Sequence, residues 1–140
     1  MKRRARRFLL GALLLTGAAC AQTPPNMPNA SDAILSRIRL LIGDAACTSA
    51  SQCQVLPVGA RPCGGPDSFL AWSTQRTDAA ALMALAKAHA VQRQREDDKS
   101  GRQSTCEVLP TPLASCLFAE AGQAGRCTLQ ATTGNAAAIR

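Results

Sequence analysis

The sequence predicts an α+β domain: a small antiparallel sheet with one long helix packed on it and a short N-terminal helix, stapled by three disulfides. Three observations predict this fold. An alanine-rich segment at about residues 78–99 and a shorter apolar stripe after residue 31 both have helical periodicity. Short apolar runs bounded by proline and glycine lie on both sides of the long helix, as strands do. Of seven cysteines, six lie beyond residue 21, which suits three cross-links in a small domain.

Residues 1–21 have the layout of a bacterial signal peptide. Five basic residues and no acidic residue occur in residues 1–7, and the uninterrupted run Phe8–Ala19 of apolar and small residues follows. This run has 12 residues, whereas a helix that crosses a bilayer needs about 20. The sequence therefore predicts export to the periplasm and cleavage, and not a permanent transmembrane helix.

Two cleavage sites remain open. The segment Gly17–Cys20 resembles the lipobox of bacterial lipoproteins, with Gly17 where leucine is usual. This resemblance implies cleavage after residue 19, a lipid on Cys20 and an outer-membrane anchor. Small residues at Ala19 and Ala21 fit ordinary cleavage after residue 21 equally well. The two arginines ahead of the apolar run also resemble a twin-arginine signal, which we rank last because that route carries folded cargo.

The net charge narrows the range of partners. The full chain has a formal charge of +7, but without the signal peptide 11 Lys and Arg face nine Asp and Glu, which leaves +2. Nucleic-acid-binding domains are typically far more basic. We expect no nucleic-acid partner, and membrane contact only through a lipid on Cys20.

The remaining chain divides into three parts. Residues 22–30 contain three prolines and form a short tether, residues 31–130 form a single disulfide-bonded domain, and residues 131–140 are predicted to be a disordered tail. The domain has three large aromatic residues and no tyrosine. Since such a core is thin, disulfides worth about 2–4 kcal/mol each contribute much of its stability.

The first helix is expected to begin with Ser31 as its N-cap and Asp32 in the first turn, and to end at Gly43. We expect its apolar stripe to pack on its own domain. A helix lying on a membrane surface is the alternative, favoured by two arginines on the polar side. The stripe comprises Ile34, Leu35, Ile38, Leu41 and Ile42.

Two strands are expected at residues 54–58 and 69–72, ahead of the long helix. Thr77 is expected to cap that helix and Gly101 to end it. Its last part, residues 92–99, is almost entirely polar. We expect this part to project into water.

Three more strands are expected at Cys106–Leu109, Ser115–Ala119 and Gly125–Leu129. A four-residue hairpin loop at residues 120–123 would place Cys116 and Cys127 directly opposite each other. This geometry predicts a Cys116–Cys127 disulfide.

Proximity in sequence then favours Cys47–Cys53, which leaves Cys63–Cys106 as the third pair. The spacing contains no Cys-x2-Cys pair, so zinc binding and thioredoxin-like exchange are not expected. We expect no metal and no cofactor.

Catalytic groups are few. His89 is the only histidine and lies on the apolar stripe of the long helix, where we expect a structural role. No phosphate-binding glycine loop is present in the sequence. An enzyme that uses His89 is therefore the alternative with least support.

The most distinctive segment runs from Arg61 to Asp67, with two prolines and a cysteine around a pair of glycines. Glycine permits positive φ, and proline and a disulfide fix the loop's shape. A rigid exposed loop lowers the entropy cost of binding. A tight structural turn is the alternative. The candidate binding residues are Arg61, Gly64, Gly65, Pro66 and Asp67.

The succession of Cys47-x5-Cys53, the Cys63-Gly64-Gly65-Pro66 motif, the aromatic run ending at Trp72 and the final cysteines resembles a group of small exported bacterial proteins without an assigned activity. The resemblance covers about residues 44–130. It implies an envelope location and one disulfide-bonded domain, and no mechanism.

These observations predict a cell-envelope protein that binds an unidentified protein or envelope ligand and has no catalytic activity. The narrower alternative is an inhibitor of a periplasmic or secreted hydrolase that presents the loop from Cys63 to Pro66. Preorganisation of that loop is the feature common to both hypotheses.

Overall fold

The computed structural model describes residues 29–119 and 123–131. The signal peptide with Cys20, nearly all of the tether, most of the hairpin turn at residues 120–123, and the tail from residue 132 lie outside the described residues.

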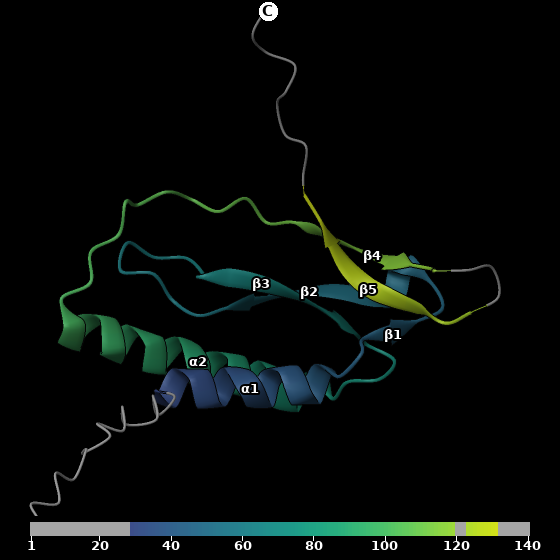
Figure 1. Ribbon diagram of the computed structural model, residues 1–140, viewed down its shortest axis with the longest axis horizontal. Helices are drawn as coiled ribbons and strands as arrows, with labels where there is room; N and C mark the ends of the chain where they lie inside the picture. The colour runs from purple at the N-terminus through teal and green to yellow at the C-terminus, as the bar shows by residue number, and fades with distance from the viewer. Residues whose placement is uncertain (1–28, 120–122, 132–140) are drawn as a thin grey trace, which may run out of the picture.

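The described residues form two α-helices and two antiparallel sheets with three disulfides, which confirms the predicted α+β class. One sheet has three strands in the order β1-β5-β4, and the other pairs β2 with β3 (Figure 1). The elements are α1 (Ala30–Ile42), β1 (Ala46–Cys47), the 3-10 turn η1 (Ala50–Gln52), β2 (Cys53–Val58), β3 (Ser68–Ser73), α2 (Ala79–Ser100), β4 (Leu113–Leu117) and β5 (Gly125–Gln130).

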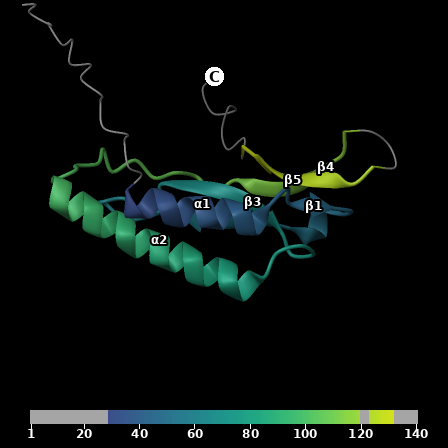
Figure 2. The same cartoon turned by 60° about the horizontal axis from the view of Figure 1, so that its bottom comes forward.

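The two helices lie side by side on one side of the strands (Figure 2). The apolar stripe of α1 points into the domain, where Ile38 and Ile42 are buried, so α1 packs on its own domain as expected. The core between helices and sheets also contains Leu56, Trp72 and Leu82. No helix within residues 29–119 and 123–131 is both long and apolar enough to span a membrane.

The N-cap of α1 is Asn29 and not Ser31, because Asn29 Oδ1 accepts the amide hydrogen of Asp32 at 2.9 Å. Ser31 is buried, and both its hydroxyl (2.6 Å) and its amide (3.1 Å) donate to the carboxylate of Glu96 near the end of α2. The start of α1 is thus fixed to the end of α2, and the helices are antiparallel.

The N-cap of α2 also differs from the expected residue, here by one position. Asp78 accepts from the amides of Ala80 and Ala81, whereas Thr77 is buried. Gly101 ends the helix in the left-handed conformation, with φ 64°, as the sequence predicts.

The expectation that the end of α2 projects into water holds for only one side of the helix. Asp97 is 5% exposed, and Arg93 and Glu96 are largely covered. The exposed residues among 92–99 are Gln94, Arg95, Asp98 and Lys99. The loop before β3 and the start of α1 both pack against this part of the helix, and they supply polar partners that no sequence periodicity reveals. The polar residues here connect three segments of the chain.

Two of the three expected disulfides are wrong. The structure contains the expected Cys63–Cys106 bond, but Cys47 is bonded to Cys116, and Cys53 is bonded to Cys127. Cys116 and Cys127 do lie opposite each other in the β4–β5 register. Both side chains point to the inner face of the sheet, where each finds a partner on another strand. Cys47 and Cys53, although close in sequence, enter different sheets.

Gly125 is required by the Cys47–Cys116 disulfide. This bond joins β1 to β4, which flank β5, and therefore crosses over β5. Gly125 is the register partner of Cys47, and a Cβ at Gly125 would lie 2.6 Å from Cys116 Sγ. Only a residue without a side chain leaves room for the bond at this point.

We therefore expect Gly125→Ala to lower the free energy of unfolding by about 1–3 kcal/mol, the usual cost of overpacking. Urea denaturation followed by the fluorescence of the only tryptophan, Trp72, measures this change. In a background with Cys47→Ala and Cys116→Ala, the same substitution should cost less, because the sulfur is gone. An equal cost in both backgrounds would show that the disulfide is not the obstacle.

Candidate functional site

The loop between β2 and β3 folds into a tight turn. Gly64 donates its amide to the carbonyl of Arg61 at 2.9 Å, and Arg61 donates its amide to the carbonyl of Gly65 at 3.0 Å. Gly64 and Gly65 have φ values of 93° and 81°, which other residues rarely adopt. A Cβ built at either glycine meets no atom within 4 Å. Conformation therefore requires these glycines, and their backbone remains open to an approaching molecule.

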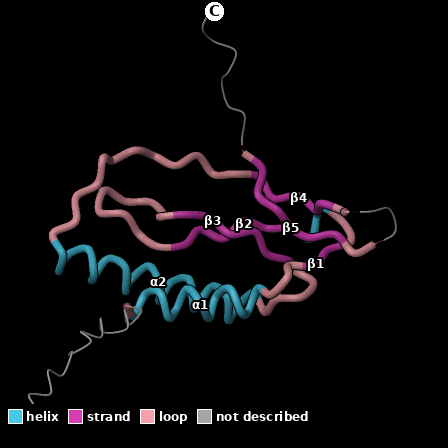
Figure 3. The backbone as a smooth tube through the Cα atoms, viewed as in Figure 1, coloured by secondary structure: helices cyan, strands magenta, loops and turns pink. Residues whose placement is uncertain are grey.

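The second segment of the site lies between α2 and β4. The strand expected at Cys106–Leu109 is absent, and this stretch is irregular, with Cys106 at φ 57°. Two links attach it to the glycine loop: the Cys63–Cys106 disulfide and a 2.6 Å hydrogen bond from Arg61 Nη1 to the carbonyl of Glu107. Figure 3 shows both irregular segments, in pink, at the same end of the molecule.

A pocket of about 260 Å³ lies between the two segments. We call its lining residues the clasped-loop surface. Val108 at its rim is 87% exposed, the largest exposure of any bulky apolar side chain in the described part of the chain. The lining residues are Arg61, Cys63, Gly64, Gly65, Pro66, Glu107, Val108 and Leu109.

Four of the five candidate binding residues thus come together, but Asp67 does not line this pocket. The carboxylate of Asp67 turns towards α2 and pairs with Arg93 at 3.0 Å. Sequence reasoning missed Glu107, Val108 and Leu109, because their place depends on which cysteine Cys106 joins. The expected pairing of Cys63 with Cys106 was the one sequence signal that places these three residues beside the glycine loop.

Arg93 is the centre of a polar network. Besides Asp67, its guanidinium lies 3.6 Å from carboxylate oxygens of both Glu96 and Asp97. Burial alone would lower the pKa of Arg93, but the hydrogen bond and charge of Asp67 raise it. A Cβ at Gly59 would collide with the Asp67 side chain. Glycine at this position therefore lets Asp67 fix the loop to α2.

His89 lies within the domain, with 4% of its surface exposed, and its Nδ1 atom has no hydrogen-bond partner. Burial lowers its pKa from 6.5, and the charge of Arg93 lowers it further, while the charges of Asp67, Glu96 and Asp32 oppose these effects. A general base needs access to the proton that it removes from a substrate. The burial of His89 leaves little such access.

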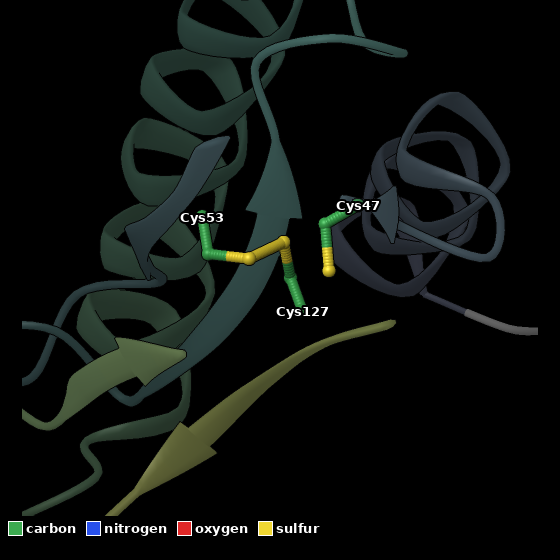
Figure 4. A group of neighbouring side chains, drawn as sticks. All are labelled: Cys47, Cys53 and Cys127. Carbon is green, nitrogen blue, oxygen red and sulfur yellow. A yellow bond between two sulfur atoms is a disulfide. The ribbon is translucent and has the colours of Figure 1, made fainter. Parts of the chain in front are cut away.

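Three buried sulfur atoms form a cluster that resembles a set of metal ligands. Those of Cys47, Cys53 and Cys127 lie within 4.8 Å of one another (Figure 4). Metals bind the thiolate form of cysteine, whereas each of these sulfurs belongs to a disulfide, Cys53 with Cys127 and Cys47 with Cys116. The cluster consists of two disulfides packed side by side, and its role is structural.

The chain matches no protein-family model, no curated protein and no solved structure. The resemblance to small exported bacterial proteins therefore stays a prediction. The three disulfides are themselves typical of proteins from oxidising compartments.

Removing the surface disulfide should loosen the clasped-loop surface and spare the core. With Cys63→Ala and Cys106→Ala together, we expect faster amide hydrogen exchange in residues 61–66 and 102–109, and an unchanged near-ultraviolet signal from Trp72. The matched control, Cys53→Ala with Cys127→Ala, should alter the Trp72 signal, because that disulfide lies in the core with Trp72. Protection that stays unchanged in both loop segments would contradict this expectation.

The burial of His89 predicts that stability falls in mild acid. Because the folded state lowers the pKa of His89, its neutral form stabilises the fold above pH 6.5, and this contribution is lost as the pH falls below that value. The slope from one such proton is at most about 1.4 kcal/mol per pH unit. Urea denaturation between pH 7.5 and 5 should show a smaller decline for His89→Leu than for the natural protein. Parallel declines would exclude His89 as the cause.

Proposed function

We propose that this protein is exported to the bacterial cell envelope, where it binds another molecule through the clasped-loop surface and performs no catalysis. The signal peptide predicted at residues 1–21 and the three disulfides support export to the periplasm. Intact-mass measurement distinguishes a soluble protein that starts at Gln22 from a lipoprotein that starts at a modified Cys20.

The observation that carries the binding proposal is a disulfide that fixes two irregular exposed segments around a pocket. Cys63 and Cys106 are both exposed, so their bond contributes little to the buried core. The disulfide holds the accessible backbone of Gly64 and Gly65 beside the exposed side chain of Val108. Such preorganisation reduces the entropy lost on binding.

The shape of the surface bears on the inhibitor alternative. An inhibitor that presents a loop to a hydrolase inserts a projecting segment into the enzyme's cleft. The glycine turn instead forms one wall of a hollow whose opposite wall is Glu107, Val108 and Leu109. A hollow favours acceptance of a side chain or small group from the partner, and we therefore prefer the general binding function.

Capture and affinity measurements with the full oxidised protein test this proposal. Envelope extracts supply partners, and binding of the purified partner is then compared between the natural protein and Val108→Ser. We expect a loss of at least about tenfold in affinity, equal to about 1.4 kcal/mol, because Val108 stands at the rim of the pocket.

Leu40→Ser is the matched control, since Leu40 is 81% exposed on α1 and lies outside the clasped-loop surface. It should bind as the natural protein does. Full affinity in Val108→Ser, or loss of affinity only in Leu40→Ser, would overturn the proposed surface.

A further inference from the structure

A second hollow lies between the two helices. It has a volume of about 510 Å³, within the ~300–1,000 Å³ typical of small-ligand sites. It shares no lining residue with the clasped-loop surface. We call it the helix groove; it is lined by Ile34, Ala84, Lys87, Ala88, Val91, Gln92 and Arg95.

The floor of the helix groove is apolar. Ala84 and Ala88 lie one turn apart on α2, and their short side chains leave a depression beside Ile34 of α1. Val91 extends this apolar strip and is 44% exposed. An apolar chain lying in the groove would cover surface that now faces water, which is favourable in proportion to the area covered.

The two charged side chains of the groove are both cations, and neither is paired with a carboxylate in the described part of the chain. Lys87 and Arg95 line it, and neither forms a salt bridge within residues 29–119 and 123–131. Arg93 on the same helix, by contrast, is surrounded by three carboxylates. No acidic residue lines the groove. Gln92, its remaining polar residue, already donates to Glu96.

The spacing of the two cations suits a ligand with a charged end. Lys87 and Arg95 are eight residues apart, which places them about 12 Å apart along the helix axis, with Ala88 and Val91 between them. A hydrocarbon chain can lie on the apolar strip while its terminal carboxylate accepts a charge-assisted hydrogen bond from one cation. A cationic or neutral amphiphile gains only the apolar part of this interaction.

We propose that the helix groove binds the hydrocarbon chain of a fatty acid, with its carboxylate held by Lys87 or Arg95. Charge complementarity and an apolar floor support this binding, which is independent of the function proposed for the clasped-loop surface.

Dodecanoate, used below its micelle concentration, is the probe. The full oxidised protein, purified as the cell processes it, is titrated calorimetrically with dodecanoate and with dodecyltrimethylammonium, which has the same chain and the opposite charge. We expect saturable one-to-one binding of dodecanoate, at least about tenfold tighter than binding of the cation. Equal affinities, or uptake that does not saturate, would overturn the proposal.

Two variants locate the site. Ala88→Leu fills the depression and should abolish dodecanoate binding, and since Ala88 is exposed, the fold should tolerate it. The double variant Lys87→Gln, Arg95→Gln should bind dodecanoate about tenfold more weakly than the natural protein does. Its affinity for dodecyltrimethylammonium should not fall. The control is Lys99→Gln, an exposed cation of α2 outside the groove, which should bind normally.

The near-ultraviolet signal of Trp72 verifies that each variant is folded. Folded Ala88→Leu protein with full affinity for dodecanoate would overturn the proposal. Binding to vesicles of anionic phospholipid without binding of dodecanoate would also overturn it, and would instead assign this face to a membrane surface.

Discussion

Two disulfides packed side by side in the core form the contact on which the remainder of the domain depends. Cys53–Cys127 joins β2 to β5 across the core, and Cys47–Cys116 joins the two outer strands of the three-stranded sheet. The chain has few aromatic residues to fill a core of this kind. Buried sulfur therefore supplies both apolar volume and covalent restraint where larger side chains would otherwise pack.

A second, polar contact fixes the surfaces relative to that core. Arg93 connects the glycine loop to α2 through Asp67, and Glu96 connects α2 to the start of α1 through Ser31. The hydrogen bonds from Ser31 lower the pKa of Glu96, because they favour its ionised form. The polar end of α2 thus positions both the clasped-loop surface and the helix that forms one side of the helix groove.

Local sequence signals predicted the elements well and their connections poorly. Periodicity located both helices and four of the five expected strands, and turn length predicted that Cys116 faces Cys127. The disulfide partners of these two cysteines were not predictable from the sequence. They depend on which other strands lie next to the β4–β5 pair in the folded domain. The prediction of a strand at Cys106–Leu109 failed for a related reason: no neighbouring strand of the described chain pairs with this short apolar segment. Glu96 illustrates the same limit, since this polar residue near a helix end is largely covered and accepts hydrogen bonds from Ser31, which lies 65 residues earlier in the chain.

The order of the disulfides along the chain has a consequence for biogenesis. The bonds from Cys47 and Cys53 cross each other in sequence, with separations of 69 and 74 residues, and only Cys63–Cys106 joins consecutive cysteines. A chain that pairs each cysteine with its neighbour in sequence would form Cys47–Cys53 and Cys116–Cys127, and both of these bonds would have to be exchanged to reach the native pairing. The closeness of the sulfurs of Cys47, Cys53 and Cys127 gives a thiolate in this cluster a short path to a neighbouring disulfide. A chain oxidised in that sequence order therefore needs disulfide isomerisation in addition to oxidation before it reaches its native pairing.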